Sequence, residues 1–97
     1  LIKLITTASE NKVIISQLLR SVTSMGANAN EADGVSTKND FIHCFTIVRK
    51  ETKETIYWLL LLSELNSQLK ERITILIKEG NEVVAIVSKI ISNSRNK

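Results

Sequence analysis

Asp40 and His43 are three positions apart, a spacing that puts two metal ligands on one face of a helix. Helical bundles build di-metal sites from four carboxylates and two histidines, and each histidine belongs to a Glu-x-x-His motif. The other candidate ligands in this chain are Glu31, Glu51 and Glu54. The chain has one histidine, so half of that ligand set is missing. We therefore expect no metal site and no cofactor, and we expect His43 to be a partly exposed residue on the first turns of a helix.

The possible nucleophiles have no suitable base beside them. Cys44 follows His43 directly, so on a helix their side chains point about 100° apart, which is poor geometry for a nucleophile–base pair. Ser21, Thr23 and Ser24 also lack a neighbouring base, and the three glycines are too scattered to form a phosphate-binding loop. The sequence therefore predicts that the protein is not an enzyme, and that Cys44 is a small hydrophobic residue.

Polar residues recur along one side of the first long helical segment, and two glutamates lie one turn apart in the second. If these faces meet, Arg20 pairs with Glu51 or Glu54, and Asn28 forms a hydrogen bond across the gap, because a buried charge needs a partner. The alternative is two solvated faces that never meet. We favour a network that sets helix register or a subunit interface. Its members are Arg20, Ser24, Asn28, Glu31, Glu51 and Glu54.

Three long helices and a short N-terminal stub, residues 1–8, are expected to position these residues. The first long helix runs from Lys12 to about Asp33, because its apolar residues recur every three or four positions. Asn11 is the expected N-cap and Gly34 the expected C′ residue. Gly26, inside this helix, costs about 1 kcal/mol relative to alanine. We expect the close approach of a neighbouring helix to offset that cost.

The second long helix opens with a capping box, in which Thr37 is the cap and Asp40 replaces the usual glutamate. It continues to about Leu65, a length of about 40 Å at 1.5 Å per residue, and Trp58 is an expected core residue. The third follows Asn66 or Ser67, one of which is its expected N-cap. We expect it to continue through Gly80, because the apolar pattern keeps its phase on both sides of this glycine.

The composition favours an all-α protein. The chain has 97 residues, 43% of them hydrophobic and 24% charged, with no proline. We predict a single domain over residues 1–97, an up-and-down four-helix bundle whose first helix is largely missing from this chain. One cysteine excludes an internal disulfide. The longest apolar run is too short to span a membrane and no signal peptide is visible, so we expect a cytoplasmic protein without a membrane partner.

The formal net charge is +3, and the whole surplus lies in the last third of the chain. Residues 67–97 carry six basic and three acidic side chains, whereas the two earlier thirds are balanced. A nucleic-acid partner would explain such a surplus. On charge alone we favour the alternative, in which basic residues collect at the helix C-terminus to complement the helix dipole. The candidate phosphate contacts are Lys70, Arg72, Lys78, Lys89, Arg95 and Lys97.

Two separated motifs resemble one protein family. The stretches "QLLRSVTSMGANANEA" and "STKNDFIHCFTIVRKETKETIYWLLLL" are similar to the four-helix-bundle proteins encoded in intervening sequences of bacterial 23S ribosomal RNA genes. The resemblance is close over residues 17–62 and looser elsewhere. Val22 replaces a usual glycine and Thr37 a usual serine. The matching residues include Gln17, Leu18, Leu19, Arg20, Ser24, Gly26, Asn28, Glu31, Asp40, His43, Glu51, Glu54 and Trp58.

The resemblance implies a left-handed up-and-down bundle that assembles into a ring, commonly a pentamer. A related branch, the accessory protein of diversity-generating retroelements, works with a reverse transcriptase and binds nucleic acid through a basic surface. We therefore predict a non-enzymatic homo-oligomer that binds RNA or a ribonucleoprotein. The alternative is an adaptor that binds only proteins, with its positive charge placed at helix ends.

Overall fold

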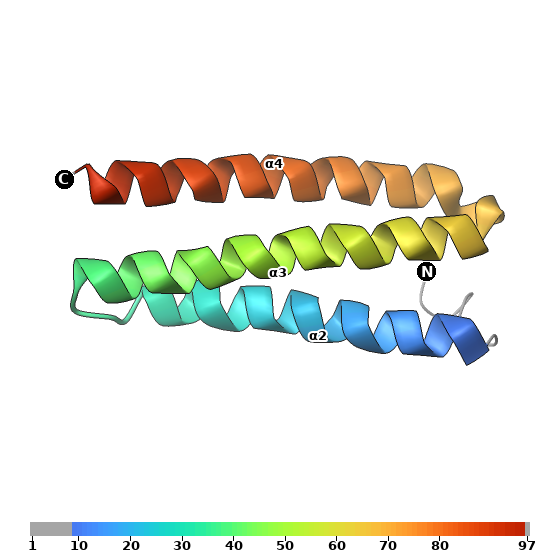
Figure 1. The fold of residues 1–97 in the computed structure, drawn as a ribbon, viewed down its shortest axis with the longest axis horizontal. Helices are drawn as coiled ribbons and strands as arrows, with labels where there is room; N and C mark the ends of the chain where they lie inside the picture. Colours follow the sequence, from blue (N-terminus) through green and yellow to red (C-terminus); the bar gives the residue numbers. More distant parts are fainter. Residues whose placement is uncertain (1–8, 97) are drawn as a thin grey trace.

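Three long helices and one short 3-10 turn make up residues 9–96, the part of the chain that the computed structural model describes (Figure 1). The helices are α2 (Ser9–Ala32), α3 (Lys38–Leu65) and α4 (Lys70–Arg95), and the turn η1 spans Ser67–Leu69. Consecutive long helices run antiparallel (Figure 1). The all-α prediction is confirmed. A four-helix bundle is not shown, because three long helices are present and the expected stub, residues 1–8, lies outside the described residues.

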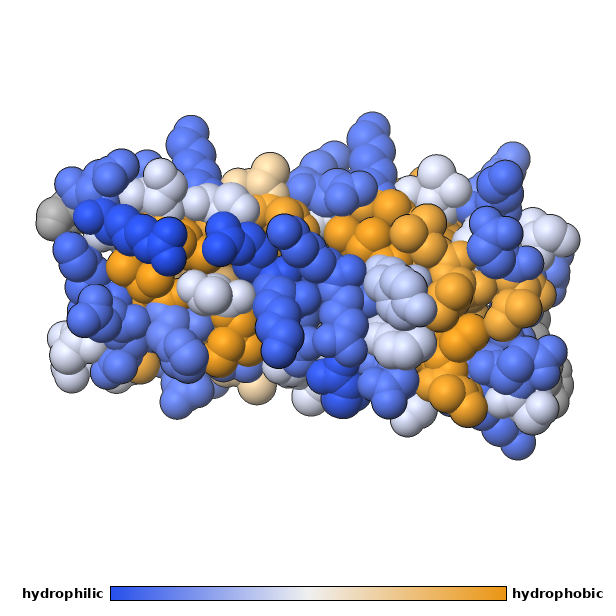
Figure 2. Space-filling model, viewed as in Figure 1, coloured by the Kyte–Doolittle hydropathy of each residue, from blue (hydrophilic) through white to orange (hydrophobic). Residues whose placement is uncertain are grey.

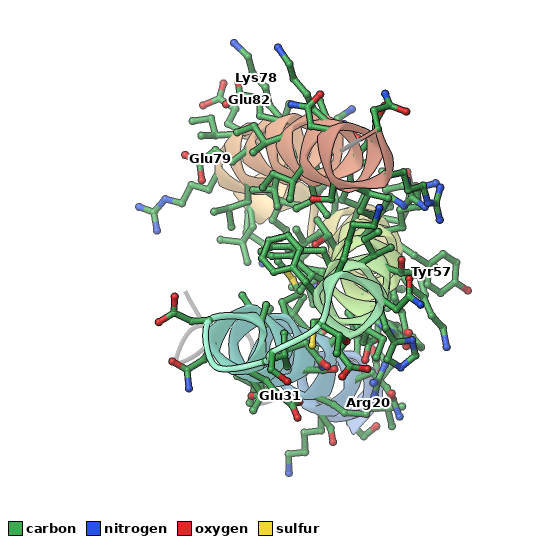
Figure 3. The ribbon with its side chains drawn as sticks, turned by 90° about the vertical axis from the view of Figure 1, so that its left-hand side faces the viewer. Arg20, Glu31, Tyr57, Lys78, Glu79 and Glu82 are labelled. Carbon is green, nitrogen blue, oxygen red and sulfur yellow. The ribbon has the colours of Figure 1, made fainter. Side chains whose placement is uncertain are left out.

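α3 is the central helix of the molecule. Both α2 and α4 pack along it, and no extensive contact joins α2 to α4 within the described residues. Seen end-on, the three helices form an arc that is closed by α3 on one side and open between α2 and α4 on the other (Figure 3). The molecule therefore has a convex face formed by α3 and a concave face between its two neighbours.

The core consists of two apolar clusters separated by a polar layer. The larger cluster joins all three long helices near the end of α3, and its fully buried members are Leu62 and Ile73. The smaller joins α3 to the C-terminal half of α4 through Val48, Val87 and Ile91. Between them along α3 lie threonines, and Ser21 faces this layer from α2 with no exposed surface. Burial of a polar layer requires that its groups be hydrogen-bonded.

Asn11 and Asn66 are not the helix caps that the sequence predicts. α2 begins at Ser9, so Asn11 lies inside its first turn, with 3% of its surface exposed. Its side-chain amide exchanges two hydrogen bonds with that of Asn66, at 3.0 and 2.9 Å. Asn66 makes no side-chain cap. Asn66 also donates to the carbonyl of Leu62 at 2.9 Å, so its side chain faces Asn11 and α3 and does not cap the first turn of the next helix.

The end of α2 also differs from the prediction. The helix ends at Ala32, and the next two residues close the turn by donating to carbonyls three residues back, at 3.3 Å from Asp33 and 3.0 Å from Gly34. No described glycine has a positive φ, so Gly34 is not a left-handed C′ residue. The N-terminus of α3 is as predicted, because the hydroxyl of Thr37 accepts a hydrogen bond from the backbone N–H of Asp40 at 3.1 Å.

Close helix packing occurs at a different glycine from the one expected. A Cβ added to Gly26 would meet no other atom within 4 Å, so no neighbouring helix of the described chain approaches it, and that prediction is wrong. A Cβ at Gly80 would lie 2.9 Å from Cγ1 of Ile56. Close helix packing therefore occurs at Gly80, on the contact between α3 and α4. The prediction that α4 continues through Gly80 is confirmed.

Candidate functional site

An ion-pair cluster joins the middle of α2 to the middle of α3. Arg20 bonds Glu51 through Nη1 at 3.0 Å, Glu54 through Nη2, and the side chain of Gln17 through Nε at 3.0 Å. The indole N–H of Trp58 donates to the same Oε1 of Glu54 at 3.3 Å. The predicted meeting of the two polar faces is thus confirmed at Arg20, whose guanidinium spans two carboxylates one helical turn apart.

The cluster is held by charge. Hydrogen bonds from Arg20 and then from Trp58 lower the pKa of Glu54 below its usual value. The bonds to Glu54 and Glu51 raise the pKa of Arg20. Glu54 is therefore ionised at neutral pH and does not serve there as a proton donor. Since Glu51 has only 10% of its side chain exposed, the arrangement acts as a clamp that fixes α2 against α3.

A hydroxyl pair extends this contact into the core. Oγ of Ser21 and Oγ1 of Thr55 lie 2.8 Å apart, and each hydroxyl also has a backbone carbonyl of its own helix within reach, at 3.0 Å for Ser21 and 2.8 Å for Thr55. No buried side-chain nitrogen or oxygen among residues 9–96 lacks a hydrogen-bond partner. The polar layer is thus satisfied, and it fixes which residues of α2 and α3 face each other.

The remaining residues of the predicted network do not join it. The side-chain amide of Asn28 donates to the carbonyl of Ser24 at 2.9 Å and to its hydroxyl at 3.3 Å, one turn back in α2. The expected bond from Asn28 across to α3 is therefore not formed, because an acceptor one turn away on the same helix is within reach. Glu31 is exposed near the end of α2 (Figure 3).

The residues considered for metal binding line a polar hollow of 390 Å³ near the turn between α2 and α3. Glu31, Asp40 and His43 border it, and Cys44 lies buried at its edge. Burial, and then the charges of Glu31 and Asp40, raise the pKa of the Cys44 thiol. Within residues 9–96, no three such ligands are grouped so that they could hold a metal ion. Cys44 is a buried, weakly acidic thiol, as its expected hydrophobic role requires.

An apolar groove of 770 Å³ runs between α2 and α4 on the concave face. Leu19 and Val22 of α2 border it with about half of their surface exposed, and Leu76 and Val83 border it from α4. Glu79 is the charged residue on its wall, and it points toward this open side (Figure 3). Exposed apolar side chains that border a groove are typical of a surface that contacts another protein segment, a membrane or a ligand.

The basic residues predicted to contact phosphate are exposed but scattered. Lys70 and Arg95 lie at opposite ends of α4, about 37 Å apart along its axis. Lys78 and Lys89 share one side of the helix, and Arg72 lies on another. Lys97 lies outside the described residues. The structure therefore does not gather the predicted contacts into one patch.

A second group of basic residues lies on α3 and is not predicted from the sequence. Arg49, Lys50 and Lys53 lie on the convex side of α3, whereas Glu51 and Glu54 turn toward α2. Counting charges by segment hides this group, because the acidic residues of the same helix cancel it. Helical periodicity is the signal that separates the two sets, since positions 49, 50 and 53 share one face.

Comparison with known proteins identifies the family. A family model described as "23S rRNA-intervening sequence protein" matches residues 2–89. The chain belongs to this family. It is also similar to the crystal structure of a protein of unknown function from the S23 ribosomal protein family of Bacteroides thetaiotaomicron VPI-5482, with 37% identity and a TM-score of 0.77. That match covers 81% of this chain and 73% of the other. No curated protein matches.

Several residues that carry the family resemblance have a structural role in this member of the 23S rRNA-intervening sequence protein family. Arg20, Glu51, Glu54 and Trp58 all belong to the motifs, and the structure joins them in one cluster. In residues 9–96, no helix combines the length and the apolar character needed to cross a bilayer. The surfaces left for binding are the basic residues of α3 and α4 and the apolar groove.

Proposed function

We propose that this member of the 23S rRNA-intervening sequence protein family is a non-enzymatic, oligomeric helical scaffold that binds structured RNA or a ribonucleoprotein in the bacterial cytoplasm. The supporting observation is the C-terminal half of α4. From Val83 to Asn96 it carries Lys89 and Arg95, both exposed, and no carboxylate. Cations without neighbouring carboxylates attract phosphate and release its counterions.

The test is the electrophoretic mobility of a labelled RNA hairpin at low and at moderate salt. Binding by phosphate neutralisation predicts a shift that fades steeply as salt rises. Lys89→Glu and Arg95→Glu should each weaken the shift. Lys12→Glu, an exposed lysine of α2, is the control because it changes the net charge equally. Loss of binding in the control as large as in the α4 variants would contradict a role for α4.

The apolar groove supports a finer proposal about architecture. A further helix that covers Leu19, Val22 and Leu76 would complete an up-and-down four-helix bundle, since it would contact both α2 and α4. By resemblance, such bundles assemble into a ring, and we propose a pentamer. Light scattering coupled to size exclusion measures the assembly directly, and a monomer at micromolar concentration would contradict the ring.

The same groove favours a second candidate, an adaptor that binds only proteins. Apolar residues exposed over a groove of this size are typical of protein contacts. The two candidates differ in the mobility experiment. A folded, oligomeric protein that produces no shift at low salt would support the adaptor and exclude the RNA scaffold.

A further inference from the structure

The convex face of α3 carries a local excess of positive charge that the chain as a whole does not show. Arg49, Lys50 and Lys53 lie on this face. The carboxylates of the same stretch, Glu51 and Glu54, bond Arg20 on the side of α2. Arg20 offsets one of these two negative charges and holds both carboxylates on the side of α2, so the convex face keeps a net excess of positive charge. Hydrophilic residues accordingly form a band across the middle of α3, between two hydrophobic regions (Figure 2).

These three basic residues surround a shallow hollow of 330 Å³, whose remaining wall is Thr46. Arg49 lies toward α4, where its Nη1 is 3.4 Å from Oγ of Ser88. The hydroxyl of Thr46 donates its proton to the carbonyl of Ile42 at 2.8 Å, so Thr46 shapes the hollow without donating to a ligand. The donors available to an anion are therefore the guanidinium and the two ammonium groups.

An exposed aromatic ring extends this face by one turn. Tyr57 follows Lys53 by four residues, has 53% of its surface exposed, and points outward from α3 (Figure 3). Its ring packs edge-on against that of Trp58, with centroids 5.0 Å apart and an interplanar angle of 69°. Trp58 packs against the core, so the tyrosine ring is braced from within while much of its surface stays free.

We infer that this face is the binding site for unpaired segments of the RNA. Arg49, Lys50 and Lys53 bind consecutive phosphates of a single-stranded RNA segment, and one base stacks on Tyr57. Three cations one turn or less apart suit a phosphate backbone, and an aromatic ring beside them suits an unpaired base. This inference rests on the proposed function and names the surface and the RNA form that it uses.

A single strand fits this face better than a duplex or an acidic peptide. Bases in an A-form duplex are stacked on one another, and their π-faces do not reach a protein ring. An acidic peptide would use the cations but would leave Tyr57 without a role. The site also has no buried polar side chain to read base edges, so we expect binding with little sequence preference.

The first experiment measures how affinity depends on salt for labelled oligouridylate and for an RNA duplex of equal length. The test variant is Arg49→Gln with Lys50→Gln and Lys53→Gln. The comparison variant removes the same charge from the rival surface, through three glutamine substitutions at the α4 residues Lys70, Arg72 and Lys78. Each phosphate contact to a single strand contributes about 0.7 to the salt slope, so the test variant should lower that slope by about 2.

The second experiment tests stacking. Tyr57→Leu should weaken binding of oligouridylate by about 5-fold or more, which corresponds to about 1 kcal/mol of base–aromatic stacking, and should leave duplex binding nearly unchanged. Tyr57→Phe keeps the ring and should retain the affinity of the wild type. An equal loss for single strand and duplex would overturn the stacking role.

The outcomes separate the two proposals. If the wild type binds neither RNA, both the scaffold and this site are wrong. If it binds oligouridylate and the α4 variant lowers the salt slope of affinity as much as the α3 variant does, or more, the α3 site is wrong and the RNA-binding scaffold is retained. Circular dichroism melting establishes that each variant is folded. The charge-conserving variant with Arg49→Lys, Lys50→Arg and Lys53→Arg should retain the slope, and its failure to do so would overturn charge as the cause.

Discussion

The contact between α2 and α3 differs in kind from the contact between α3 and α4. The first contains an amide pair, an arginine bonded to two carboxylates, and a pair of buried hydroxyls. The second is formed mainly by aliphatic side chains and a glycine, with one long polar contact between Arg49 and Ser88. α2 also packs Ile14, Ile15 and Leu18 against α3 in the larger apolar cluster, so the first contact combines apolar and polar groups, whereas the second is largely apolar.

The difference indicates that one contact mainly sets the alignment of the helices and the other mainly stabilises the fold. Apolar burial is favourable in many registers, whereas a buried hydrogen-bonding group is satisfied in few. The three polar groups of the α2–α3 contact are spread along α2 from Asn11 to Ser21, and a shift of one turn would break the amide pair and separate the two hydroxyls. We expect the α3–α4 contact to supply more stability per residue, and the α2–α3 contact to set alignment.

The largest expected effect comes from the apolar contact. Ile91→Ala should lower the free energy of unfolding by about 2–5 kcal/mol, because Ile91 is 1% exposed and truncation leaves a cavity beside Val48 and Val87. Urea denaturation measures the change. Ser21→Ala is the matched truncation on the other contact and should cost about 1 kcal/mol, since the hydroxyl of Thr55 retains its own carbonyl partner. Equal losses of unfolding free energy in the two variants would contradict the different roles of the two contacts.

The amide pair should give the next effect. Asn11→Leu should cost about 1–3 kcal/mol, because it leaves the carbonyl oxygen of the Asn66 side chain buried without its donor. The variant that carries Asn66→Leu as well should recover part of this loss, since both polar groups are then gone. A double-mutant cycle by denaturation measures the coupling. Additive losses would show that the two amides do not depend on each other.

The two helical glycines should respond with opposite signs. Gly26→Ala should raise stability by about 1 kcal/mol, because the added Cβ meets no atom and alanine favours helix. Gly80→Val should lower it by about 1–3 kcal/mol, because its side chain would overlap Ile56. Thermal melting compares them. A destabilised Gly26→Ala protein would contradict this prediction and would indicate a contact at Gly26 that residues 9–96 do not make.

The smallest effect is the dependence of the ion pair on pH. The folded pKa of Glu54 is lowered, so its pairing with Arg20 stabilises the fold above the unfolded carboxyl pKa, about 4.3. That stabilisation is lost as pH falls through the lower folded value. Melting temperature between pH 7 and pH 3 should therefore fall less steeply for Arg20→Gln than for the wild type. Glu64→Gln, on an exposed residue of α3, should keep the wild-type slope.

Helical periodicity was enough to predict the class of the fold, the three long helices and the pairing of Arg20 with Glu51 or Glu54. It could not predict the role of Asn11, because the partner of that amide is 55 residues away in the chain. A glycine is equally ambiguous, since the sequence does not say which neighbour approaches it. The predicted hydrogen bond from Asn28 to α3 is absent for a simpler reason, because Ser24 offers acceptors one turn away in α2.

The candidate binding surfaces also depend on contacts that the sequence pattern does not reveal. Exposure of the α4 cations follows from their place in the pattern, but their scatter around that helix became clear only once its bounds were known. The basic face of α3 depends on where two glutamates point, and Arg20 on another helix decides that. A charge count along the chain averages over both faces of a helix and cannot separate them.

The open arrangement around α3 also has a consequence for how the chain folds. Every extensive helix–helix contact among the described residues joins helices that are consecutive in the chain. No long-range loop has to close before native contacts begin to form, so contact order is low and folding in microseconds to milliseconds is expected. Either hairpin, α2 with α3 or α3 with α4, can form first on the way to the native state.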